Sequence, residues 1–217
     1  AQVTLVSGPV SLGVPAGVER VPVRTACEML AAAEGAFAAC DIAVFTAAVA
    51  DMRPAAPAEH KLKKGAANDA DLLSRVELVD NPDILATLAA GKREGQVVVG
   101  FAAETDDVVD NARRKLASKH ADLIVANRVG EGVAFGTDDN QASLVMAASC
   151  EDLPLMPKRE LADRILDQAL ALRGERRAHR GLEPGGLPAV GLRAQGLRPG
   201  GGGGRGHVGG VGQVGAQ

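Results

Sequence analysis

The stretch "QVVVGFAAETDDVVDNARRKLASKHADLIVA", Gln96–Ala126, decides the fold class. It opens with a run of β-branched residues up to Phe101, which is typical of a buried strand. We expect Thr105 to cap a helix that runs to about His120, and the apolar run Asp122–Ala126 to form a second strand. A strand, a helix and another strand in this order indicate a parallel βαβ unit.

The sequence on both sides of this stretch repeats the alternation of strand and helix. The apolar runs are continuous, as a sheet that is covered on both faces requires. We therefore predict an α/β fold, with a Rossmann-like, mostly parallel sheet and helices on both faces. The other expected strands are Gln2–Ser7, Val21–Val23, Ile42–Thr46, Arg75–Val79 and Ala142–Ala147, and the other expected helices are 25–39, Ile84–Ala90 behind an Asn81 cap, and Pro157–Arg173.

The composition limits the classes of function. The chain has 217 residues, 46% of them hydrophobic, and a net charge of -3, which suits one globular domain with an appendage. Four Phe are the only aromatic residues, so we expect no base-stacking surface for single-stranded nucleic acid. The sequence contains no apolar run long enough to span a membrane and no signal peptide, so we predict a cytoplasmic protein without a membrane partner.

The cysteines and histidines show no metal-binding or disulfide spacing. Cys27, Cys40 and Cys150 are odd in number and lack a CxxC pair, so we interpret them as reduced thiols. The four histidines are scattered along the chain. The sequence therefore leaves any metal ligands unknown.

The chain changes character at Gly174. The segment from there to Gln217 holds 16 of the 27 glycines and six Arg against two Glu, so the preceding 173 residues are the acidic part. Such a segment buries too little apolar surface to offset its chain entropy. We predict a domain over residues 1–173 and a disordered Gly/Arg-rich tail over 174–217, for which nucleic-acid binding is a weak alternative role.

The segment after the Ile42–Thr46 strand is a candidate ligand contact. Ala47 and Ala48 begin a run of small residues, which lets a ligand approach the backbone closely, and Asp51 then offers a carboxylate. Tight packing under a neighbouring helix explains the same small residues equally well. The two interpretations stay open at this point.

Lysines gather in two places in this otherwise acidic domain. Lys61, Lys63 and Lys64 lie in a proline-flanked loop, and Lys115 and Lys119 are four residues apart, on one face of the expected helix. A solvated basic face is the common reason for such a pattern, whereas a local basic site on an acidic domain favours a small polyphosphate ligand. The chain has neither a Walker motif nor GxGxxG, so the residues alone indicate only an anion site of nucleotide size.

Seven short motifs, read in order, resemble bacterial phosphopantothenoylcysteine synthetase, the ligase half of a bifunctional enzyme of coenzyme A biosynthesis. The resemblance extends from Ala1 to about Arg173. Each motif is weak alone, and their shared order makes the match specific. They are "SGPVSL" (Ser7–Leu12), "AAVADMRPA" (Ala47–Ala55), "KLKK" (Lys61–Lys64), "NPDIL" (Asn81–Leu85), "VGFAAET" (Val99–Thr105), "ARRKLASKHADLIVAN" (Ala112–Asn127) and "FGTDDN" (Phe135–Asn140).

The resemblance implies a reaction and its partners. The family joins 4'-phosphopantothenate to L-cysteine with CTP and Mg2+, through an acyl-cytidylate intermediate, and its members are homodimers. It also implies a preceding strand and Gly-rich loop, with an Asn that handles the acyl-cytidylate, and an FMN-dependent decarboxylase half. Both would lie before Ala1, so we expect an N-terminally truncated, poorly active ligase without FMN.

The resemblance also implies residue roles. Lys61 would be catalytic, in a mobile flap that closes over the nucleotide, and Ala47 and Ala48 would contact the acyl-cytidylate. A noncatalytic nucleotide-binding or dimerisation module of the same fold is the alternative function. The implied CTP-binding residues are Asp51, Lys61, Pro82, Asp83, Ile84, Leu85, Phe101, Lys115 and Lys119.

Overall fold

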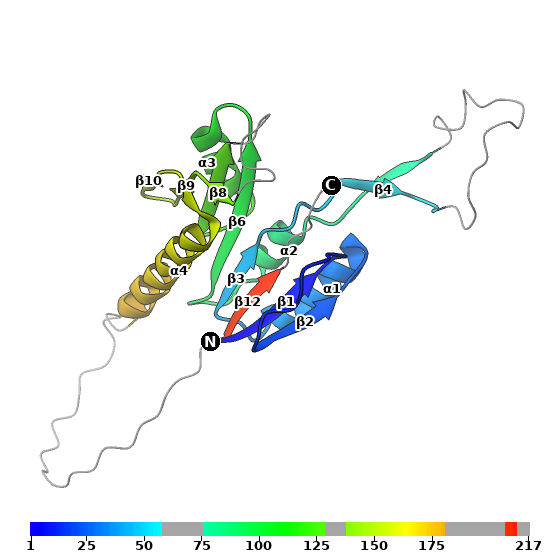
Figure 1. Ribbon diagram of the computed structural model, residues 1–217, viewed down its shortest axis with the longest axis horizontal. Helices are drawn as coiled ribbons and strands as arrows, with labels where there is room; N and C mark the ends of the chain where they lie inside the picture. Colours follow the sequence, from blue (N-terminus) through cyan, green and yellow to red (C-terminus); the bar gives the residue numbers. More distant parts are fainter. Residues whose placement is uncertain (58–75, 129–137, 181–206, 212–217) are drawn as a thin grey trace, which may run out of the picture.

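The protein is built around one large sheet. The computed structural model describes residues 1–57, 76–128, 138–180 and 207–211 (Figure 1). Within these ranges eight strands pair in the order β10-β9-β7-β6-β3-β12-β1-β2, and only the pairs that involve β9 are antiparallel. The strands are β1 (Gln2–Ser7), β2 (Val18–Pro22), β3 (Ile42–Phe45), β6 (Val97–Glu104), β7 (Leu123–Arg128), β9 (Ala142–Val145), β10 (Cys150–Asp152) and β12 (His207–Val211).

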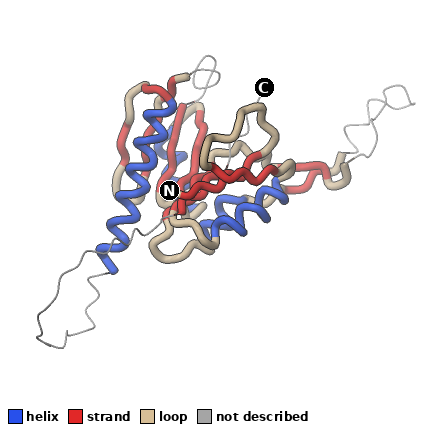
Figure 2. Tube along the Cα trace, turned by 60° about the horizontal axis from the view of Figure 1, so that its bottom comes forward, coloured by secondary structure: helices blue, strands red, loops and turns tan. Residues whose placement is uncertain are grey.

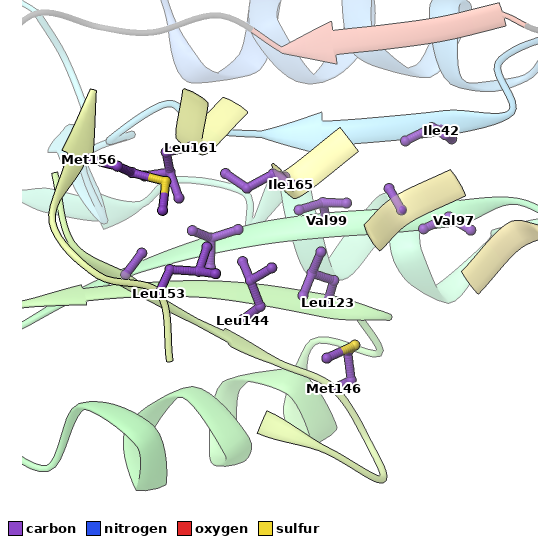
Figure 3. Close-up of a cluster of buried hydrophobic side chains, with 13 residues drawn as sticks. Ile42, Val97, Val99, Leu123, Leu144, Met146, Leu153, Met156, Leu161 and Ile165 are labelled. Atoms are coloured by element: carbon purple, nitrogen blue, oxygen red, sulfur yellow. The ribbon is translucent and has the colours of Figure 1, made fainter. Parts of the chain in front are cut away.

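Helices cover both faces of this sheet (Figure 2). Successive residues of β6 point to opposite faces of the sheet. On one face Val98 packs into a cluster with α1 (Ala26–Phe37) and α2 (Ile84–Ala90), and Ala102 packs into a cluster with α3 (Val108–Ser118). Val97 and Val99 point to the opposite face, where α4 (Lys158–Arg180) packs (Figure 3). The predicted Rossmann-like α/β class with helices on both faces is confirmed.

Local signals place the first helix as expected. Thr25 Oγ1 accepts the Glu28 N–H at 3.1 Å, and the Glu28 carboxylate accepts the Arg24 N–H at 2.7 Å. The first bond satisfies a backbone donor that the first helical turn would otherwise leave without a partner, and the second ties the residue before the cap to the same turn. The capping box in the sequence therefore marks the true start of α1.

Two other helix starts differ from the prediction. Asp83, not Asn81, caps α2, because its carboxylate accepts the Ala86 N–H at 2.9 Å. The third helix begins at Val108, after Asp107 in a left-handed backbone conformation (φ 46°), and not directly after Thr105; β6 continues to Glu104 in register with β7. Pairing with a neighbouring strand extends β6 beyond the end of its apolar run.

A separate ribbon follows β3. In it β4 (Met52–Pro54) pairs antiparallel with β5 (Leu78–Asp80), and the ribbon projects from the body of the molecule (Figure 1). The predicted strand Arg75–Val79 thus starts later, at Leu78, and belongs to this ribbon and not to the main sheet. A second small pair joins β8 (Asp139–Asn140) to β11 (Met156–Pro157).

Two described elements extend beyond the predicted division at Gly174. Helix α4 continues to Arg180, because Arg173 pairs with Asp41 at 2.5 Å and Arg176 pairs with the buried Asp122. These contacts anchor the last turns of α4 to the sheet. Strand β12 also comes from the predicted tail, while residues 181–206 and 212–217 lie outside the described residues. No helix in the described part of the chain is long and apolar enough to cross a bilayer.

Candidate functional site

A cleft of about 460 Å3 opens at the carboxyl ends of β3 and β6. Ligands of open α/β sheets bind at this edge. Nine of the eleven residues that the sequence analysis singled out line the cleft. They are Ala47, Asp51, Pro82, Asp83, Ile84, Leu85, Phe101, Lys115 and Lys119.

Asn81 holds two walls of the cleft together. Its side-chain amide donates to the Ala50 carbonyl at 2.8 Å, and its backbone N–H donates to the Asp51 carbonyl at 2.7 Å. The segment after β3 is therefore tied to the segment that enters α2. Two motifs about 30 residues apart in the sequence meet through this one side chain.

Helix α3 supplies the basic wall. Lys115 and Lys119 are four residues apart, so both face the cleft from the same side of the helix. The Lys115 ammonium lies 3.4 Å from the Glu104 carboxylate, and Lys119 forms an ion pair with Asp83. These partners could not be predicted from the sequence, because each acid comes from another element.

The charge of Asp83 is stabilised in the folded protein. Burial alone would raise the pKa of this carboxyl group, but hydrogen bonds from Lys119 and the Ala86 N–H, with the charges of Lys119 and Lys115, outweigh it. The net effect lowers the pKa of Asp83 below its ordinary value of 3.8. Lys119 therefore faces a carboxylate at neutral pH.

The opposite wall is apolar. Phe45 is the last residue of β3 and Phe101 lies in the neighbouring strand β6, while Met29 comes from α1 and Leu85 from α2. Leu85 reaches the sheet because Gly100 has no side chain: a Cβ there would lie 2.7 Å from Leu85 Cδ2. The cleft thus has one apolar wall and one charged wall.

One predicted site residue does not line this cleft, and another lies outside the described residues. Ala48 is not among the lining residues, and Lys61 lies outside the described residues, as do Lys63 and Lys64. Six further lining residues were not predicted from the sequence. Three of them lie within the motifs Asn81–Leu85 and Ala47–Ala55: Asn81, which was predicted only as a helix cap, Val49 and Ala50. The other three carry no local signal, because tertiary packing alone brings them to the cleft; they are Met29, Phe45 and Asp80.

Carboxylates at the cleft suit a magnesium–phosphate ligand. Asp51 and Asp80 line it together with Asp83. Over the described ranges no group of three or more acidic, His or Cys side chains is arranged to hold a metal ion on its own. Mg2+ usually takes one or two carboxylates and completes its coordination with substrate phosphates and water, so these residues fit it.

The fold and the cleft define the class: a Rossmann-like α/β domain with a ligand site at the carboxyl edge of its parallel strands. The family follows from a sequence match. The model of the DNA/pantothenate metabolism flavoprotein C-terminal domain matches residues 1–172, and the chain belongs to this family.

The similar curated proteins are bifunctional. The chain is 46% identical over 175 residues to the coenzyme A biosynthesis bifunctional protein CoaBC of Vibrio vulnificus strain CMCP6, and 43% identical over 175 residues to that of Bacillus subtilis strain 168. The alignments cover 80% and 79% of this chain but 43% and 42% of the relatives. The chain therefore spans less than half the length of these proteins and matches their C-terminal part.

Solved structures agree with this assignment. A crystal structure of the C-terminal domain of CoaBC superposes with a TM-score of 0.64 at 35% identity, covering 80% of this chain and 77% of that one. The Streptococcus pneumoniae DNA/pantothenate metabolism flavoprotein superposes with a TM-score of 0.60 at 18% identity, covering 78% of this chain and 81% of that one, which supports the fold alone.

Proposed function

We propose that this chain is the ligase part of a coenzyme A biosynthesis enzyme, which joins 4'-phosphopantothenate to L-cysteine with CTP. The main support for the proposal is that nine residues to which the family resemblance assigns a role in binding line one cleft. The 46% identity to a CoaBC protein supports the same reaction.

The charged wall suits the phosphates of CTP. Lys115 and Lys119 supply two ammonium groups on one helix face, and Asp51 offers a carboxylate for the Mg2+ that accompanies a triphosphate. When bound, Mg2+ would neutralise phosphate charge as the acyl-cytidylate and pyrophosphate form. Because Glu104 and Asp83 already hold the two lysines, an incoming phosphate must compete with these carboxylates.

The apolar wall suits the uncharged parts of the ligands. Phe101 and Leu85 offer a surface against which a pyrimidine ring can pack, while the small side chain of Ala47 leaves its backbone accessible. The backbone after β3 would then contact the acyl-cytidylate. Lys61 would stabilise the oxyanion that develops when the cysteine amine attacks this mixed anhydride.

Nucleotide binding tests the proposal directly. Titration calorimetry with CTP, ATP, GTP and UTP in the presence of Mg2+ should show tighter binding of CTP, and Phe101→Ala and Lys115→Gln should weaken it. Equal affinity for all four nucleotides, or no binding, would contradict the proposal. Binding of CTP without any pyrophosphate release on addition of 4'-phosphopantothenate and cysteine would favour the noncatalytic nucleotide-binding module instead.

We also propose that the chain acts as a homodimer through the β4–β5 ribbon. Met52 and Leu78 are 47% and 50% exposed on this two-stranded ribbon, which projects from the body (Figure 1). A two-stranded ribbon alone is marginally stable in water, so a partner surface that covers these side chains would stabilise it. A second copy offers the same apolar side chains in return.

A further inference from the structure

The two lysines of the cleft are paired with carboxylates of the protein itself. Lys115 lies against Glu104, and Lys119 against Asp83. Glu104 stands behind Lys115 without lining the cleft. Among the described residues at the cleft, four carboxylates therefore face two ammonium groups; the carboxylates are those of Asp51, Asp80, Asp83 and Glu104.

Glu104 is held in place by a bond that does not involve the lysine. One of its carboxylate oxygens accepts the Asn111 side-chain amide at 3.1 Å, and the other lies 3.4 Å from the Lys115 ammonium. The same Asn111 amide also donates to the Asp106 carbonyl at 3.0 Å, in the segment that leads into α3. Since the Glu104 side chain is only 21% exposed and is fixed at one oxygen, it has little freedom to withdraw from Lys115.

The second pair is fixed in the same way. The Asp83 carboxylate accepts the Ala86 N–H at 2.9 Å, a bond that caps α2 and is independent of Lys119. Both carboxylates are thus anchored by contacts of their own. Their negative charge stays at the cleft when a ligand draws the lysines toward its phosphates.

Fixed negative charge acts differently on a bare anion and on its metal complex. The Coulomb energy scales with the charge of the ligand, and a bound divalent cation cancels part of the negative charge of a triphosphate. Asp51 and Asp80 also line the cleft, and carboxylates are ligands that Mg2+ accepts alongside phosphate oxygens. The described charges therefore oppose the metal-free nucleotide more strongly than the complex.

We propose that Glu104 and Asp83 are specificity-determining residues, which make the cleft select a nucleoside triphosphate that carries its divalent cation over the same nucleotide without it. Glu104 acts from behind Lys115, by opposing negative charge that no cation compensates. Lys115 remains the group that faces the phosphates. This inference rests on the proposed nucleotide site, but it does not depend on the base that is bound or on the reaction.

The Glu104→Gln variant tests the proposal, because the glutamine carbonyl can still accept the Asn111 amide and only the charge is lost. Titration calorimetry gives the dissociation constant for CTP in a Mg2+-free buffer with EDTA and in the same buffer with excess Mg2+. The ratio of the first constant to the second should fall at least about fivefold in the variant. Glu94→Gln is the matched control, since it removes the same charge from an exposed position outside the cleft, before the start of β6, and should leave the ratio unchanged.

The ratio separates charge selection from a structural role. Equal weakening of both forms of CTP by Glu104→Gln, a ratio that stays constant or rises, or an equal fall in Glu94→Gln would overturn the proposal. Circular dichroism first establishes that each variant is folded. If Glu104→Gln does not fold, Asp83→Asn, which keeps the helix cap, gives the same reading: its ratio should fall, and an unchanged ratio would overturn the proposal.

The same titrations with ATP separate this inference from the proposed function. Equal affinities for CTP and ATP, with ratios that both fall in Glu104→Gln, would support the charge selection and contradict the assignment of CTP. A clear preference for CTP, with a ratio that does not respond to Glu104→Gln, would support the proposed function and overturn the inference.

Discussion

Asp83 combines two roles at the cleft. Its carboxylate caps α2 through the Ala86 N–H and also pairs with Lys119, which comes from α3. A single side chain therefore positions a helix start and one of the two cations at the cleft. Because the ion pair is partly exposed, solvent screens its contribution to stability, and its importance lies more in holding the lysine in place.

The Asp83→Asn variant separates the two roles. Asparagine caps helices as well as aspartate does, so only the charge is lost. Because the folded-state pKa of Asp83 is lowered, its charge stabilises the native state above the unfolded pKa, near 3.8, and this contribution disappears as the pH falls through the lower folded pKa. We expect the free energy of unfolding of the variant at pH 7 to be about 0.5–1 kcal/mol lower than that of the parent protein.

Denaturant titration at several pH values measures this effect. The difference in unfolding free energy between the parent and Asp83→Asn should shrink as the pH falls below about 4, because the protonated carboxyl and the amide carry the same charge. A difference that stays constant between pH 7 and pH 3 would show that the charge of Asp83 does not stabilise the fold.

Lys119→Gln tests the role of the basic wall. If Lys119 contacts a phosphate of CTP, loss of its charge should raise the dissociation constant for CTP by roughly tenfold, the value of one charge-assisted hydrogen bond. Arg113→Gln is the matched control, since it removes the same charge from an exposed position on the same helix, outside the cleft. Equal weakening by both variants, read by calorimetry, would indicate a general charge effect instead of a contact.

At the scale of elements, the packing of α2 on β6 shapes the apolar wall. Gly100 leaves the space that Leu85 and Ile124 fill, and a Cβ at this position would lie 2.7 Å and 2.9 Å from their side-chain methyl carbons. Leu85 also lines the cleft. A change at Gly100, which does not line the cleft, should therefore move a residue that does.

Gly100→Ala should destabilise the fold by about 1–3 kcal/mol, because the added methyl group overpacks the interface between α2 and β6. It should also weaken nucleotide binding by displacing Leu85 toward the cleft. In the Leu85→Ala background the same substitution should cost much less, and a double-mutant cycle of unfolding free energies measures the coupling. Additive effects of the two substitutions would show that the contact between the added methyl group and Leu85 does not cause the loss of stability.

Sequence patterns predicted the main elements because their signals are local. The β-branched run that starts β6 and the Thr25–Glu28 capping box each form their structure from adjacent residues. The ribbon strand β4 was missed because three exposed residues carry no periodic signal. The Lys119–Asp83 pair was missed because its members are 36 residues apart and meet only when α2 and α3 pack.

At the scale of the whole molecule, the end of helix α4 and all of strand β12 lie beyond the predicted division at Gly174. Composition alone made the Gly-rich segment look unable to form structure, yet the pairing of β12 depends on backbone groups, which every residue except proline supplies in full. The same limitation applies to assembly. Exposed apolar residues are common in monomers, and only their gathering on the projecting ribbon favours a partner.

Leu78→Lys tests the proposed dimer. This side chain is 50% exposed on the ribbon, and a charge there would be buried without a partner if a second copy covers it. We expect the variant to shift the chain from dimer to monomer in size-exclusion chromatography with light scattering, by roughly a hundredfold in dissociation constant. Leu170→Lys, at a 52% exposed position on α4, is the control and should leave the mass unchanged. If Leu170→Lys dissociates the dimer and Leu78→Lys does not, the interface lies on α4, and the ribbon must be stabilised within one chain.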